Sequence, residues 1–243
     1  MAPAFLATDG LSNMALGPFY VAQKLIENHA LRGAAMLMRH GETDWNREGR
    51  VMGRNPVELN ARGRAQVEAT ARLVQSLRPD LIVTSPLVRA RQSAELMSAG
   101  LGGVETIEEE AIAEVNYGRW EGMIYHELIE DPYYAEYRKA PVENPTPGGE
   151  TIPQVQARGV EAVTRALKEN PDRRVLFVSH GDIIRTVLCH YMGLELKFFN
   201  RLRIDNASIS TVQVAGKFAE LKFLNLLPEP GQAFIAPFDV KRT

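Results

Sequence analysis

Short apolar runs alternate along the chain with longer stretches in which apolar residues recur at helical spacing. The short runs are bounded by glycine, proline or charged residues, a pattern typical of buried strands. The longer stretches predict helices between them. We predict strands at 34–39, 80–84, 104–108 and 175–179, a short edge strand at 111–115, and a closing pair near 208–214 and 218–224.

Capping residues mark where several helices begin. Asn60 is an N-cap for a helix to about residue 78, and Thr151 with Gln154 resembles a capping box for a helix to about residue 170. Ser85-Pro86 combines a capping serine with a proline at the first helical position, which predicts a helix to about residue 100. A further helix follows the strand at 175–179. Strands alternating with helices predict a three-layer α/β sandwich, with a mostly parallel central sheet and helices on both faces.

The α/β pattern leaves a segment at each end of the chain. Residues 1–33 are an N-terminal extension with a predicted accessory helix over 18–32, and 227–243 are a tail rich in proline and glycine. We assign 34–226 to one domain, because a chain of 243 residues has ample apolar content for a single large core. Within it, 121–150 is aromatic and interrupted by prolines, which predicts short helices and a loop.

Composition and charge exclude several classes of partner. Lys and Arg number 28 against 30 Asp and Glu, a formal net charge of −2, so no overall positive field attracts nucleic acid or an acidic membrane. The sequence has no apolar run long enough for a transmembrane helix and no secretory signal pattern. Cys189 is the one cysteine and fits a reducing compartment. We expect a cytoplasmic protein, and the N-terminal helix is the first place to seek a homodimer contact.

Two of the predicted strands end in a histidine followed by a glycine. Arg39-His40-Gly41 follows the first strand, and Ser179-His180-Gly181 follows the strand at 175–179. In parallel sheets, ligands bind outside the carboxyl ends of the strands. If the two strands are neighbours, His40 and His180 face each other over one pocket.

The residues in these motifs are suited to phosphoryl transfer. A neutral histidine can attack phosphorus, while cations hold the charge on the transferring group. Arg39 and an arginine from another element could supply that clamp, since a guanidinium binds two phosphate oxygens at once. No metal is then required. A carboxylic acid must protonate the leaving oxygen. The sequence alone leaves several candidates open: Glu42, Asp44, Glu114, Glu121 and Asp182.

The order of the motifs resembles that of the histidine phosphatase superfamily, the fold family of the cofactor-dependent phosphoglycerate mutases, and within it the phosphatase branch. The resemblance runs from about residue 34 to 224. It depends on five separated signatures: Arg39 to Asn46, Thr84-Ser85-Pro86-Leu87 through Arg89-Ala90, Glu114 through Gly122, Pro147-Gly148-Gly149-Glu150, and Ser179-His180-Gly181.

The resemblance implies a role for each matching residue. His40 is expected to become phosphohistidine, and Glu114 to protonate the leaving oxygen and then activate water. Arg39, Arg89 and His180 are expected to bind the phosphoryl oxygens, with Gly181 and Asn46 beside them. It implies no cofactor and no metal.

Each role has a simpler structural alternative. Arg89 could be a helix-surface arginine, since Arg91 lies close by, and Asn46 could cap a turn. Glu114 competes with other nearby acids, and we favour it because it precedes the Gly118-Trp120 signature. The segment 125–139 is expected to roof the pocket, with His126 the one further histidine placed to touch substrate; His29 and His190 are expected to be structural or exposed. The competing acids are Glu108, Glu109, Glu110 and Glu121.

Other classes of enzyme fit the sequence less well. A cysteine phosphatase needs an arginine six residues after its cysteine, but that position after Cys189 is Glu195. No Gly-rich loop ending in Gly-Lys-Ser or Gly-Lys-Thr supports nucleotide hydrolysis. Phosphoglycerate mutases carry a long insertion after the acid signature, for which the chain has no room between Glu114 and His180.

The leading hypothesis is therefore a metal-independent phosphomonoesterase of broad-specificity type, which hydrolyses a small phosphate ester. A phosphoglycerate mutase is the alternative, and a non-catalytic binding protein on the same scaffold is a third. The loop Gly53-Arg54-Asn55-Pro56-Val57-Glu58-Leu59 departs from the family's usual Gly-x-x-Asp-x-Pro-Leu pattern. This departure affects the predicted substrate-facing rim of the site. The sequence does not identify the substrate.

Overall fold

The computed structural model describes residues 33–216 and 218–228, so the predicted helix over 18–32 and most of the tail lie outside the described residues. Its centre is a six-stranded sheet with the order β3-β2-β4-β1-β5-β6. The first four strands in this order are mutually parallel, and β5 runs antiparallel to β1 and β6. The strands are β1 (Ala34–Arg39), β2 (Leu81–Thr84), β3 (Thr106–Glu108), β4 (Val175–Ser179), β5 (Ile209–Ala215) and β6 (Phe218–Leu226).

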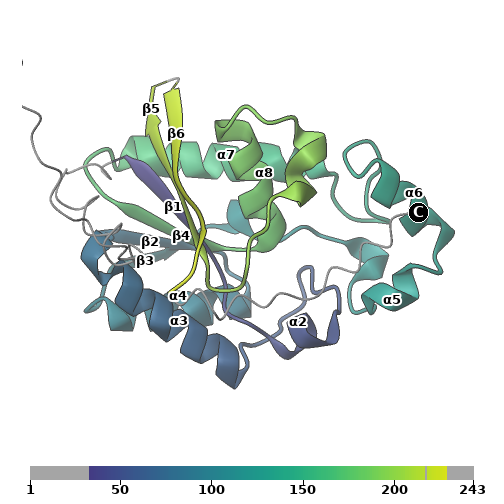
Figure 1. The fold of residues 1–243 in the computed structure, drawn as a ribbon, viewed down its shortest axis with the longest axis horizontal. Helices are drawn as coiled ribbons and strands as arrows, with labels where there is room; N and C mark the ends of the chain where they lie inside the picture. The colour runs from purple at the N-terminus through teal and green to yellow at the C-terminus, as the bar shows by residue number, and fades with distance from the viewer. Residues whose placement is uncertain (1–32, 217, 229–243) are drawn as a thin grey trace, which may run out of the picture.

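Helices cover both faces of this sheet, as Figure 1 shows. Alternate residues of β1 point to opposite faces. Ala35 and Leu37 pack in a core with α7 and α8, whereas Met36 and Met38 pack in a second core with α3 and α4. The helices are α2 (Asp44–Glu48), α3 (Ala61–Val74), α4 (Val88–Gly100), α5 (Tyr125–Leu128), α6 (Pro132–Lys139), α7 (Ile152–Glu169) and α8 (Gly181–Tyr191). The three-layer α/β prediction is confirmed.

Two capping predictions are confirmed. The Asn60 side chain accepts a hydrogen bond from the Gly63 N–H at the start of α3, and Thr151 and Gln154 form a reciprocal capping box at the start of α7. Helix α3 ends at Val74 and continues as a 3₁₀ turn over Gln75–Leu77. No helix in the described part of the chain is long and apolar enough to cross a membrane.

Two predicted elements are wrong. The helix predicted to begin at Ser85-Pro86 begins at Val88, because the Ser85 hydroxyl accepts from the Leu87 N–H in a tight turn before the helix. The edge strand predicted over 111–115 is replaced by a 3₁₀ turn at Glu110–Ile112 and an extended segment. The guanidinium of Arg158 donates hydrogen bonds to main-chain carbonyls of this segment, which a neighbouring strand would otherwise bind.

Candidate active site

The central strands β1 and β4 bring the two His-Gly pairs together. They are parallel neighbours, with Arg39 opposite Ser179, so both chains leave the sheet at the same edge. The His40 N–H donates to the Ser179 carbonyl at 2.9 Å. The rings of His40 and His180 lie with centroids 5.2 Å apart and planes tilted by 57°. The expectation that the two histidines face each other is confirmed.

The surroundings of His40 select one ring tautomer. Its Nδ1 lies 2.7 Å from the Gly41 carbonyl, which only accepts hydrogen bonds, so Nδ1 carries the proton. The other nitrogen, Nε2, is buried without a hydrogen-bond partner in the described residues. Burial, and then the charges of Arg89 and Arg39, lower the His40 pKa well below its ordinary value. His40 is therefore neutral near pH 7, with a lone pair on Nε2.

His180 lies at the N-cap position of α8 and contacts a residue from a third strand end. Its Nε2 lies 2.8 Å from Ser85 Oγ, which already accepts from the Leu87 N–H. If the Ser85 hydroxyl donates to Nε2, the proton of His180 is on Nδ1. That Nδ1 is also buried without a partner among the described residues. Ser85 can thus hold the tautomer in which His180 offers a donor to an anion.

Two arginines, the partly buried Arg39 and the fully buried Arg89, lie beside the histidine pair. Arg39 donates from Nη1 to the Ile204 carbonyl at 2.7 Å. Arg89, with no exposed surface, donates to the carbonyls of Gly53 at 2.7 Å and Asn55 at 3.1 Å. In both guanidiniums Nε has no partner within the described residues. Burial lowers the pKa of Arg89 to about 10, so the group remains charged at neutral pH.

Glu114 interacts electrostatically with both of these arginines. Its Oε1 accepts from the Val115 N–H at 3.0 Å, and its side chain lines the same cavity as Arg39. Burial, and then the negative charge of Asp182, raise the Glu114 pKa, while Arg89 and Arg39 oppose that shift. A carboxyl group with a raised pKa can stay protonated and act as a proton donor.

The competing residues have other contacts. Glu121 accepts from the N–H groups of Arg54 and Tyr117, and so holds the loop that departs from the family pattern. Arg91 is about half exposed and lies 3.8 Å from the half-exposed Glu108. The remaining acids pair with arginines or face solvent: Glu42 with Arg62, Asp44 with Arg47, Glu109 with Arg165, and Glu110 with Arg54.

Asn46 caps a turn and also lines the cavity. It forms a capping box with Thr43 at the start of α2, a short helix inside a segment predicted to be irregular. Its Oδ1 accepts from the Thr43 N–H at 3.0 Å and from Asn206 Nδ2 at 3.2 Å. These bonds leave Nδ2 as its remaining donor, and Asn46 lines the cavity. The capping contact therefore orients the amide rather than excluding a role in binding.

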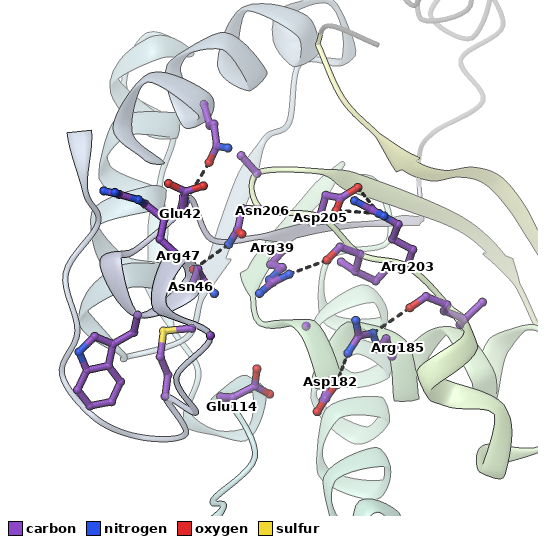
Figure 2. A pocket seen from close by; sticks show the side chains of 18 of the residues that line it. Arg39, Glu42, Asn46, Arg47, Glu114, Asp182, Arg185, Arg203, Asp205 and Asn206 are labelled. Atoms are coloured by element: carbon purple, nitrogen blue, oxygen red, sulfur yellow. Dashed lines mark hydrogen bonds and ion pairs between the residues drawn. The ribbon is translucent and has the colours of Figure 1, made fainter. Parts of the chain in front are cut away.

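A cavity of about 580 Å³ opens beside the strand ends. Figure 2 shows Arg39, Asn46, Glu114 and Asp182 around it. Gly181 lines it as well, whereas His40, His180 and Arg89 do not: they are at most 1% exposed.

The segment 125–139 covers this cavity less than predicted. Tyr125 is its one residue among those that line the cavity. Tyr134 and Tyr137 instead pack on Trp120, with ring centroids 5.4 and 5.0 Å from it. His126 is exposed and does not line the cavity.

Several contributors to the site were not predicted. Tyr117 and Arg185 bind the carboxylate of Asp182, and Asn206 donates to the His40 carbonyl at 3.2 Å. No local pattern marks these residues, and only the fold brings them together. Across the described residues, no cluster of His, Cys, Asp and Glu has the arrangement of a metal site.

Comparison with known proteins places this constellation in a family. A family model described as histidine phosphatase superfamily (branch 1) matches residues 35–227. The chain belongs to the histidine phosphatase superfamily. The uncharacterized phosphatase PhoE of Bacillus subtilis is 31% identical over 193 residues, which cover 79% of this chain and 94% of that protein.

Other members of the histidine phosphatase superfamily agree with this assignment. An acid phosphatase of Mycobacterium tuberculosis is 34% identical over 208 residues, covering 84% of this chain and 96% of that protein. The structure of a mycobacterial glucosyl-3-phosphoglycerate phosphatase with VO3 has a TM-score of 0.72 at 26% identity, covering 79% of this chain and 98% of that one. The resemblance seen in the sequence is confirmed, and the names of these relatives support phosphatase activity.

Proposed function

We propose that this protein is a phosphomonoesterase that works through a phosphohistidine on His40. The observation that carries the proposal is a set of buried nitrogens without hydrogen-bond partners in the described residues: Arg39 Nε, His40 Nε2, Arg89 Nε and His180 Nδ1. Buried polar groups are almost always hydrogen-bonded, so a cluster of exceptions indicates a ligand site. One lone pair among three donors matches a phosphoryl group, with phosphorus on Nε2 and its oxygens on the donors.

The charges of these groups support the same assignment. Arg39 and Arg89 supply positive charge where negative charge accumulates on the transferring oxygens. Both are held by carbonyls, so little reorganisation is needed when the phosphoryl group arrives. We expect the clamp to operate without a metal ion.

In the first step, the His40 Nε2 lone pair forms a bond to phosphorus while the bond from phosphorus to the leaving oxygen breaks. The Glu114 carboxyl gives its proton to that oxygen, and the alcohol departs. In the second step, the Glu114 carboxylate takes a proton from water as the water oxygen attacks phosphorus. The nitrogen–phosphorus bond breaks, inorganic phosphate leaves, and His40 and Glu114 return to their starting forms.

The size of the cavity and the names of the relatives suggest the substrate class. A volume of about 580 Å³ is in the range typical of small-molecule sites. The relatives include an acid phosphatase and a glucosyl-3-phosphoglycerate phosphatase. We infer that the substrate is a small phosphorylated metabolite.

Trapping of the phosphoenzyme and activity measurements test this proposal. Wild-type protein mixed with a ³²P-labelled phosphate ester and quenched in base should carry acid-labile phosphate, whereas His40→Ala should carry none. His190→Ala is the matched control, since His190 is exposed on α8 and outside the cavity. Stoichiometric release of inorganic phosphate, unchanged by EDTA, distinguishes a metal-independent phosphatase from a mutase. Full hydrolysis by His40→Ala would contradict the assignment.

A further inference from the structure

Asp182 is the second residue of α8, two positions after His180, and only 9% of it is exposed. Both of its carboxylate oxygens are engaged. Oδ1 accepts from Arg185 Nη1 at 2.6 Å, and Oδ2 accepts from the Tyr117 hydroxyl. Arg185 also donates from Nε to the Leu202 carbonyl at 2.9 Å, so its guanidinium is fixed. The Asp182 carboxylate is therefore held in place by an adjacent cation and a hydroxyl donor.

The bond from Tyr117 links two parts of the active site. Tyr117 lies three residues after Glu114 in the same segment, while Asp182 lies on α8, the helix that His180 caps. Burial and the Asp182 charge raise the pKa of the Tyr117 hydroxyl well above its ordinary value, so it remains a donor at every working pH. The segment that carries the proton donor is thus tied to the helix that His180 caps.

Asp182 also acts on Glu114 through its charge. Both side chains line the cavity, and Figure 2 shows them at the same end of it, with Arg185 beside Asp182. Among the charged groups that act on Glu114, Asp182 is the one whose charge raises the Glu114 pKa most, after the effect of burial.

The other elements packed around Glu114 contribute groups of both kinds. The charges of Arg39 on β1 and Arg89 on α4 favour the ionised carboxylate. Arg185 on α8 interacts with Glu114 in the same sense. Arg158 on α7 donates to the Glu114 main-chain carbonyl at 3.2 Å. The hydroxyls that interact electrostatically with Glu114 are neutral phenols: Tyr117, Tyr125 and Tyr137. Asp182 is thus the negative charge that offsets these cations.

We propose that Asp182 is a positioning residue for the proton donor: it holds the Glu114 segment against α8 and places a fixed negative charge beside the Glu114 carboxyl. Without that charge, the arginines that bind the phosphoryl group would also ionise the acid. The phosphoryl oxygens need positive charge nearby, whereas the Glu114 carboxyl needs negative charge nearby to stay protonated. Asp182 supplies that negative charge in the same cavity. This inference rests on the proposed function.

Paired charge variants test the proposal through the pH dependence of kcat/KM for an alkyl phosphate. Asp182→Asn keeps an acceptor for Tyr117 but removes the charge, so the alkaline limb of the profile should move to lower pH. On that limb kcat/KM should fall by about tenfold or more, within the range that general acids contribute. Arg185→Gln removes the opposing cation and should move the limb to higher pH. The double variant should return the limb toward its wild-type position.

Controls separate this electrostatic role from a purely structural one. Tyr117→Phe removes the hydrogen bond and keeps the charge, so it should lower kcat without moving the limb down as Asp182→Asn does. The proposal would be overturned if the alkaline limb moved in the same direction in Asp182→Asn and Arg185→Gln, or if it did not move in these two variants. If Asp182→Asn does not fold, Arg185→Gln alone still decides: a shift of its alkaline limb to higher pH supports the proposal, and no shift or a shift to lower pH overturns it. A wild-type protein without phosphohistidine contradicts the proposed function itself, whereas phosphohistidine with unmoved limbs contradicts only the role of Asp182.

Discussion

The Arg158 guanidinium and the Glu150 carboxylate form a two-point ion pair, with Nε to Oε1 at 2.8 Å and Nη2 to Oε2 at 3.0 Å. Arg158 also donates to the main-chain carbonyls of Ala111, Ala113 and Glu114. Glu150 accepts in turn from the Asn116 N–H at 2.8 Å. The pair therefore shapes the segment that presents the Glu114 side chain, although neither residue lines the cavity.

Arg158→Lys should weaken both stability and activity. A lysine cannot reproduce the planar fork, so the carbonyls of the Glu114 segment lose their donors. We expect the free energy of unfolding to fall by about 2 kcal/mol, as for other partly buried charged hydrogen bonds. Urea denaturation and kcat measure the two effects. Arg165→Lys on the same helix is the control, because its 43% exposed side chain forms surface pairs, each worth roughly 0–1 kcal/mol. Equal losses in both variants would contradict this account.

Glu114→Gln should affect substrates according to their leaving groups. An alkoxide is a poor leaving group and needs the proton, so kcat/KM for an alkyl phosphate should fall by about 100-fold or more. A nitrophenolate leaves without a proton, so kcat/KM for p-nitrophenyl phosphate should fall much less. Steady-state kinetics with both esters provide the comparison. Similar losses for the two would show that Glu114 does not protonate the leaving oxygen.

The pH profile of the wild-type protein follows from two opposed pKa shifts. His40 must be neutral, and its pKa lies well below the ordinary 6.5, so activity should persist below pH 6.5 and fall only as pH drops through the lowered value. Glu114 must be protonated, and its pKa lies above the ordinary 4.5, so activity should persist above pH 4.5 and fall as pH rises through the raised value. The measurement is kcat/KM against pH, corrected for ionisation of the substrate. An acid limb at or above pH 6.5 would contradict the His40 assignment.

Gly41→Ala should disrupt the loop after β1. A Cβ at Gly41 would lie 2.4 Å from the Gly63 carbonyl oxygen and 2.9 Å from Val67 Cγ2, so the loop could not pack on α3 as it does. We expect a loss of at least about 2 kcal/mol in stability, typical of overpacking. Gly181→Ala is the stability control, because the nearest atom to its Cβ, Arg39 Nε, is 3.7 Å away. Thermal melts of both variants give the answer, and a Gly41→Ala protein as stable as wild type would refute the steric argument.

The sheet and the histidine pair could be predicted because their signals are local. Buried strands such as β1 and β4 are short apolar runs, and each ends in His-Gly, which places the nitrogens at one edge. The N-cap at Asn60 is equally local, since its partner is the N–H of Gly63. Such features depend on a few neighbouring residues, whatever the rest of the chain does.

The remaining features depend on contacts between distant segments. Ser85-Pro86 fits both a helix start and a turn, and the hydrogen bond of Ser85 to His180 accompanies the turn. The segment 111–115 has the apolar pattern of a strand, but Arg158 donates hydrogen bonds to its main-chain carbonyls in place of a neighbouring strand. The cluster of Tyr117, Asp182 and Arg185 has no sequence signature, because these residues gain their role only from contacts that form in the folded chain.

The parallel pairing of β1 with β4 has a consequence for how activity appears during folding. His40 follows the first strand and His180 the fourth, so a chain that has not closed this pairing has the nucleophile and Arg39 without His180. Contacts between segments so far apart in sequence form late, because they close the largest loops. Hydrolysis should therefore return during refolding only with the final closure of the sheet centre, after most helical signal has recovered.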